Sequence, residues 1–168
     1  METVDPINGD APASFAGAVG LIADKVSADL VPVVQDFARL YLRRVHDGPL
    51  LDLDDDALAA HICGLFHFTN DRGLNQVAVR VFNPSREEHG YRAAGSVVEV
   101  STIDRPFLVD SVRGEIQDHS TKVIHVTHPV LGADRDEDGN LIAVMPARDA
   151  GARESVQHYQ LDRRLGAG

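Results

Sequence analysis

Cysteine is almost missing from this sequence, since Cys63 is the only one in 168 residues. A single cysteine excludes an intrachain disulfide framework and indicates a reducing compartment, so we expect a cytoplasmic protein. Lysine is nearly as rare, and 16 basic against 26 acidic residues give a net charge of −10. This acidic balance argues against nucleic acid or an anionic membrane surface as a partner. The apolar run Ala16–Ile22 is too short to span a membrane, and no basic segment precedes it as in an export signal.

Motifs of cofactor binding and catalysis are also missing. The sequence holds no Gly-x-Gly-x-x-Gly pattern, no phosphate-binding loop, no nucleophile elbow and no His-Glu-x-x-His pattern. Two histidine pairs are candidates for a metal site. His125 and His128 lie three apart in an expected strand, which sends their rings to opposite faces, and His61 and His67 diverge on an expected helix. We therefore predict no catalytic residue, no cofactor site and no metal site in this chain.

One acidic run matches half of a calcium site. The run is Asp134-x-Asp136-x-Asp138-Gly139, but Met145 stands where an EF-hand loop needs a bidentate glutamate. Because Asp138-Gly139 suits a tight turn, we interpret the run as a hairpin loop that leads into a strand at Leu141–Met145.

The residues that are present indicate one folded domain with an appendage. Hydrophobic residues make up 43% of the chain, which is typical of a folded protein and not of a disordered one. Apolar spacing predicts two N-terminal helices, Ala28–Val45 and Asp54–Asn70, and the start of another at Ser14–Lys25. We expect four segments along the chain: a disordered leader at 1–13, a helical segment at 14–70, an α+β domain at 71–163 and a tail at 164–168.

The centre of the chain is a strand, a helix and a second strand. Period-two alternation predicts a strand at Val97–Ile103, and β-branched residues predict another at Thr121–Leu131. Between them, Asp104 and Pro106 are typical of a helix start. Asp accepts hydrogen bonds from the free N–H groups of a first turn, and Pro lacks the N–H that would be unpaired there.

The central helix is expected at Phe107–His119, with one buried face made of Leu108, Val109, Val112 and Ile116. Two further strands are expected, at Asn75–Phe82 with its valines on one face, and at Ser155–Leu161.

The start of this helix resembles a signature near the N-terminus of the large bacterial NAD-specific glutamate dehydrogenases: Asp104-Arg105-Pro106-Phe107-Leu108-Val109-Asp110-Ser111. An unbroken motif of this length is far more specific than a lone glycine pattern. The similarity covers about Asp29–Arg163. Its flanking matches are Arg72-Gly73, Val79–Pro84, His89-Gly90-Tyr91, Val97–Val100, Ile124-His125, His128-Pro129 and Arg153-Glu154-Ser155.

In that family this region is an ACT-like regulatory module, and the dehydrogenase domain lies much further along a very long polypeptide. The resemblance implies an α+β, ferredoxin-like βαββ unit preceded by two helices. It also implies an N-terminal regulatory or assembly module whose catalytic domain and NAD lie outside this chain. Expected partners are further copies of the chain or the remaining domains of the dehydrogenase, with an amino acid as a candidate effector. A stand-alone amino-acid sensor is the alternative.

An ACT-type fold continues with a second helix and a fourth strand, whereas this sequence ends before such a helix. Two alternatives follow. Either the chain is a fragment, or the early strand at Val77–Val81 completes the sheet.

The candidate site is the turn that starts the central helix, formed by Asp104, Arg105, Pro106, Phe107, Asp110 and Ser111. Free N–H groups at a helix N-terminus attract carboxylates, so this turn is a candidate to bind an amino acid or to contact a partner. Amino-acid-binding ACT domains have Gly directly after Asp-x-Pro, which lets a ligand approach the backbone, but Phe107 stands here. We therefore favour core packing for Phe107, in which case Phe107→Ala would destabilise the domain by about 3 kcal/mol.

Overall fold

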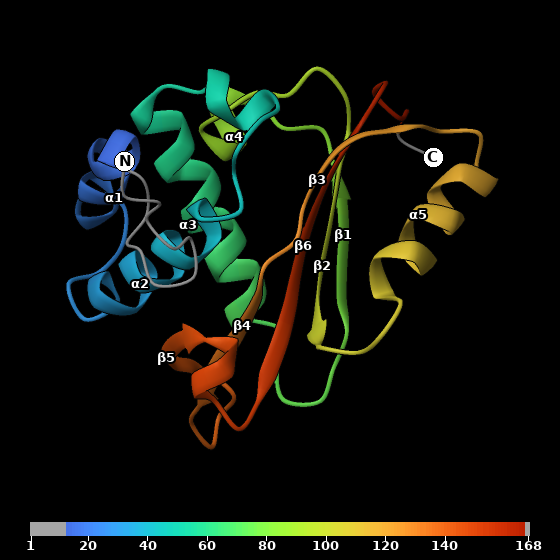
Figure 1. Cartoon of the computed structure of the whole chain (residues 1–168). Coiled ribbons are helices and arrows are strands. Elements are labelled where there is room, and N and C mark those ends of the chain that lie inside the picture. The colour runs from blue at the N-terminus through green and yellow to red at the C-terminus, as the bar shows by residue number, and fades with distance from the viewer. Residues whose placement is uncertain (1–12, 167–168) are drawn as a thin grey trace, which may run out of the picture.

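A six-stranded antiparallel sheet separates two unequal helical layers in the computed structural model, which describes residues 13–166 (Figure 1). The α-helices are α1 (Ala16–Leu21), α2 (Val31–Leu42), α3 (Asp55–Asn70), α4 (Arg86–His89) and α5 (Leu108–Asp118). The strands are β1 (Ala78–Phe82), β2 (Val97–Ile103), β3 (Val123–Thr127), β4 (Val130–Arg135), β5 (Leu141–Pro146) and β6 (Arg153–Leu161). Short 3-10 turns lie at Ala13–Phe15, Ile22–Asp24, Pro49–Asp52 and Ala147–Asp149. The strand order is β1-β2-β6-β4-β5, and β3 also pairs with β6.

The helices α1, α2 and α3 cover one face of the sheet (Figure 1). Their apolar stripes and the facing strand residues form one continuous core, in which Phe37, Phe66 and Val156 are fully buried. Pro32 lies in the first turn of α2, where its missing N–H costs no hydrogen bond. Asp54 caps α3 by accepting a 2.8 Å hydrogen bond from the backbone N–H of Ala57. The two predicted N-terminal helices are thus confirmed, and the short α1 precedes them.

The predicted leader lies almost wholly outside the described residues, and the boundary between segments 14–70 and 71–163 stays a prediction. The core nevertheless joins the two, since it includes residues from α1 through β6. None of the described helices has the length and apolar character needed to cross a membrane.

The predicted strands are present, but β1 begins at Ala78 instead of Asn75, and β5 and β6 are longer than predicted. Strand β2 has the predicted bounds, β3 and β4 divide the predicted Thr121–Leu131 strand at Pro129, and β5 follows the predicted hairpin turn. Of the two expected ways to arrange the sheet, the structure shows the one in which the early strand joins it. Strand β1 pairs with β2 from Ala78 opposite Ser101 to Phe82 opposite Val97.

The central helix α5 lies on the opposite face of the sheet (Figure 1). Its apolar residues pack against a small second core that contains Val98, Val100 and Tyr159. The prediction of a buried helix face is wrong, because the apolar residues of α5 are only partly buried. The helix covers β2 and β6 but leaves β1 bare, so its apolar side is shielded along one flank only.

A buried ion cluster ties the end of α3 to the sheet. The Glu154 carboxylate accepts hydrogen bonds from the guanidinium of Arg135 at 2.7 and 3.0 Å and pairs with Arg72 at 2.8 Å. Arg135 also donates to the carbonyls of Thr69 and Asn70, two acceptors that the end of a helix leaves unpaired. One carboxylate therefore holds two buried arginines in place.

We predict that Glu154→Gln lowers the free energy of unfolding by about 3 kcal/mol, because it leaves two buried guanidinium groups without their counter-charge. Urea unfolding measures the change. The same substitution at the exposed Glu137 is the control and should cost less than about 0.5 kcal/mol. Equal stability of the two variants would show that the arginines find other partners.

Candidate functional site: an apolar groove beside α5

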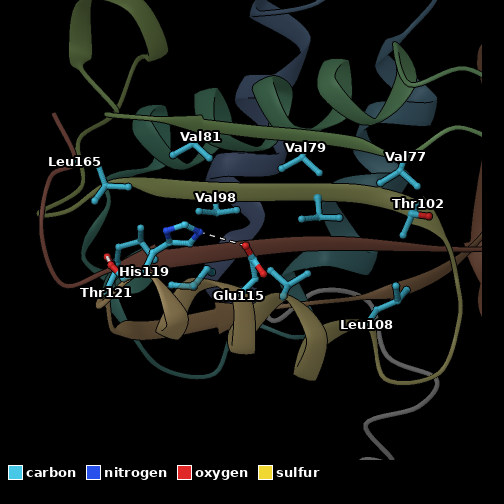
Figure 2. A pocket seen from close by; sticks show the side chains of 14 residues that line it. Val77, Val79, Val81, Val98, Thr102, Leu108, Glu115, His119, Thr121 and Leu165 are labelled. Carbon is cyan, nitrogen blue, oxygen red and sulfur yellow. Dashed lines mark hydrogen bonds and ion pairs between the residues drawn. The ribbon is translucent and has the colours of Figure 1, made fainter. Parts of the chain in front are cut away.

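An apolar groove of about 430 Å³ lies between α5 and the strands β1 and β2 (Figure 2). The row Val77, Val79 and Val81 lines one side of the groove, and α5 lines the other side. Its other lining residues are Val98, Val100, Thr102, Leu108, Val112, Glu115, Ile116, His119, Thr121, Leu161 and Leu165.

The valine row explains why the groove is open. Val77, Val79 and Val81 share one face, as predicted, but their exposed fractions are 67%, 60% and 55%. In an ordinary edge strand the apolar face points into the core. Here Arg80 points to the face covered by α1, α2 and α3, which leaves the valines on the α5 face, in the part that α5 does not cover. A contiguous exposed apolar surface of this kind is typical of a contact site for another protein element.

The groove has little charge of its own. Glu115 lies on α5 and His119 directly follows the helix, with Glu115 Oε1 3.2 Å from His119 Nε2 (Figure 2). Both side chains are 75% exposed, so this pair sits at the rim and leaves the interior apolar. The groove therefore suits an apolar side-chain row better than an ionic ligand.

The predicted turn differs from its expected geometry. The residue that caps α5 is Phe107, and no side chain caps the helix, so the prediction that Asp104 accepts the first N–H groups is wrong. Phe107 has φ of 65°, a left-handed conformation that a residue with a Cβ adopts only at a cost. The chain turns at Phe107 and not at Asp104, whose backbone N–H instead donates to the carbonyl of Arg153.

The prediction that Phe107 packs into the core is also wrong. Its ring is 78% exposed, because the left-handed turn directs it away from both cores. The hydroxyl of Ser111 donates to the Phe107 carbonyl at 2.9 Å, which braces the turn from within the helix.

The candidate turn residues do not gather around one cavity. Asp104 borders a second cavity of about 750 Å³, next to Arg72 and Arg153. The other candidates, Arg105, Pro106, Phe107, Asp110 and Ser111, are exposed. A ligand-binding or interface role for this turn stays a prediction.

Sequence reasoning missed a buried polar row that crosses the sheet beneath the helices. Arg80 on β1 lies opposite Glu99 on β2, Glu99 lies opposite His158 on β6, and His158 lies opposite Thr127 on β3. Arg80 donates two hydrogen bonds to Glu99 Oε2, at 2.9 and 2.7 Å, and His158 Nδ1 lies 3.2 Å from Glu99 Oε1. Because the row is assembled by strand pairing, no local spacing in the sequence reveals it.

Burial and charge set the ionisation of this row. Burial alone would raise the pKa of Glu99, but the hydrogen bond from His158 and the charge of Arg80 more than offset it and hold the pKa below its usual value. On α3, His61 faces the row, with ring centroids of His61 and His158 4.6 Å apart. Burial, reinforced by His158, lowers the pKa of His61 to about 3, so the imidazole is neutral at physiological pH.

Comparison with known proteins now decides the family. A family model described as the glutamate dehydrogenase ACT1 domain matches residues 37–167, which include α3, α5 and all six strands. This chain belongs to the glutamate dehydrogenase ACT1 family.

Two relatives of this ACT1 chain are NAD-specific glutamate dehydrogenases. The protein from Halomonas elongata is 32% identical over 148 residues, which cover 84% of this chain and 9% of that protein. The protein from Pseudomonas aeruginosa is 36% identical over 97 residues, which cover 56% of this chain and 6% of that protein. The chain thus spans less than a tenth of the length of these relatives. No solved structure matches it.

We predict that replacing Phe107 in this ACT1 domain separates a packing effect from a backbone effect. Phe107→Ala should cost less than about 0.5 kcal/mol, because the ring is exposed. Phe107→Gly should be more stable than Phe107→Ala by about 1 kcal/mol, because glycine has no Cβ to strain at positive φ. Chemical denaturation measures both.

Phe66→Ala is the control for a fully buried phenylalanine and should cost about 3–5 kcal/mol. A comparable loss for Phe107→Ala would place the Phe107 ring in a packed environment, contrary to its observed exposure.

Proposed function

We propose that this chain is the N-terminal regulatory and assembly module of an NAD-specific glutamate dehydrogenase. The enzyme would convert glutamate and NAD to 2-oxoglutarate, ammonia and NADH, with the catalytic domain and the NAD site outside this chain. The observation that carries the proposal is the ACT1 match over residues 37–167, combined with two relatives that bear the dehydrogenase name. The open groove gives such a module a surface with which to make contacts.

The assembly role rests on β1 and the groove beside it. Among residues 13–166, strand β1 is the edge of the sheet and pairs only with β2, so its outer N–H and C=O groups can pair with another strand. The valine row next to this edge is exposed and uncharged. Two antiparallel β1 edges related by a two-fold axis would extend the sheet and place two apolar valine rows side by side. The occupant that we propose for this face is therefore a second copy of the module.

A regulatory role needs an effector, and an amino acid is the effector that the resemblance implies. Calorimetric titration with a panel of amino acids tests this part of the proposal. Tight binding of one amino acid by the isolated chain would also favour the stand-alone sensor.

We predict that the chain forms a dimer at micromolar concentration and that Val79→Asp weakens the dimer by about 100-fold, because it places a charge in the apolar contact. Light scattering after size-exclusion chromatography measures the association. Ile142→Asp is the matched control, because Ile142 is also 60% exposed but lies on β5, away from the groove.

A stable monomer, or equal effects of the two variants, would contradict self-association through β1. A monomer that binds the remaining domains of the dehydrogenase through the valine row would assign the groove to those domains instead.

We also predict that the purified chain forms no NADH from glutamate and NAD, because no dinucleotide-binding motif and no acid–base set occur in its sequence. Absorbance at 340 nm follows the reaction, and a complete NAD-specific glutamate dehydrogenase is the positive control. Glutamate-dependent NADH formation by the chain alone would overturn the assignment of catalysis to another domain.

A further inference from the structure

The strongest unassigned feature is the contact between His61 and the polar row. His61, Glu99 and His158 each offer one ligand atom, and these atoms lie within 4.8 Å of one another. Within residues 13–166 this is the one group of three such residues that could hold a metal ion. All three side chains are buried, with exposed fractions of 1%, 0% and 0%.

In each of the three residues, one polar atom has a neighbour outside the group. The Tyr41 hydroxyl holds His61 Nε2 at 2.9 Å, and Arg80 holds Glu99 Oε2. The amide nitrogen of Gln160 lies 3.5 Å from His158 Nε2. The atoms left over are His61 Nδ1, Glu99 Oε1 and His158 Nδ1. Outer partners of this kind orient the ligands in protein metal sites.

Two observations indicate that the group suits an ion. His61 Nδ1 is buried and has no hydrogen-bond partner among the described residues. An unpaired buried polar atom is costly, and a metal ion would satisfy it. The second observation is the 3.2 Å separation of His158 Nδ1 and Glu99 Oε1. Ligand atoms on one tetrahedral zinc ion lie about 3.3 Å apart, given bonds of about 2.0–2.1 Å.

A cavity borders the group at His61. A cavity of about 450 Å³ is lined by His61 and Arg80 and also by Asp71, Glu88, His67 and His89. Carboxylates and imidazoles are ligands of divalent transition ions, so this lining favours entry of a cation over an anion.

We propose that His61 Nδ1, Glu99 Oε1 and His158 Nδ1 form a binding site for a divalent transition-metal ion, for which Zn²⁺ is the probe. Two histidines and one carboxylate form a donor set that zinc uses in proteins. The ion would replace the hydrogen bond between His158 and Glu99. The His158 proton would move to Nε2, where the Gln160 amide can turn its oxygen to accept it. The ion would then link α3 to β2 and β6.

Arg80 determines how tightly the ion is held. Its guanidinium lies 2.7 Å from Glu99 Oε2 and opposes a second cation, so we expect weaker binding than at a closed structural zinc site. Arg80 is itself fixed between the rings of Phe68 and Phe82, 4.7 and 4.6 Å from its central carbon. Removing its charge should therefore strengthen metal binding, an effect that a surface histidine site would not show.

Titration of the metal-free chain with Zn²⁺ and with Co²⁺ tests the site. We expect one ion per chain and, for Co²⁺, visible absorption bands typical of low coordination number. His61→Gln should bind at least about 100-fold more weakly, since it removes a ligand while its amide can still bond to Tyr41. Its matched control is His46→Gln, an exposed position between α2 and α3 and outside the cavity that borders His61, which should bind as the wild type does. Arg80→Gln should bind more tightly.

Side-chain ¹H–¹⁵N spectra of the wild-type chain keep the test independent of whether a variant folds. One equivalent of Zn²⁺ should shift the imidazole nitrogens of His61 and His158. No stoichiometric binding, shifts confined to other histidines, or equal affinity of His61→Gln and His46→Gln would each overturn the proposal.

Discussion

The arrangement of the sheet depends on the burial of one carboxylate. Glu99 is fully buried at the centre of the sheet, and a buried charge is tolerated only when it is paired and hydrogen-bonded. Its partners come from the two flanking strands, Arg80 on β1 and His158 on β6. Because a shift by one residue would move Glu99 or its partners to the other face, the row fixes the register of three strands at once.

The same requirement accounts for the groove. Arg80 points to the helical layer to reach Glu99, so Val79 and Val81 must point to the opposite face. Helix α5 lies over β2 and β6 and leaves that part of the sheet bare. The inward polar row and the outward apolar row are thus two consequences of the alternation along one strand.

Two buried ion clusters hold different parts of the structure together. Around Glu99 the charges lie on neighbouring strands, whereas Glu154 joins Arg72 and Arg135 at the end of α3 and so connects a helix to the sheet. The ACT1 family model spans both clusters, from within α2 to the end of the sheet. In this chain α3, α5 and the sheet are therefore parts of one family domain.

Local sequence determined most of the secondary structure and the family. Alternation gave the bounds of β2, Asp54 marked the start of α3, and the motif beginning at Asp104 led to the dehydrogenases, because each of these signals is contained in a short stretch of chain. Tertiary structure decided everything that depends on which segments meet. The sequence placed the helix cap at Asp104 and Phe107 in the core, but the chain turns at Phe107 and exposes it, since the preceding residues still pair with β6 up to the bond from Asp104 to Arg153. His61, Glu99 and His158 lie on different elements, and only the packing of α3 against paired β2 and β6 brings their ligand atoms together.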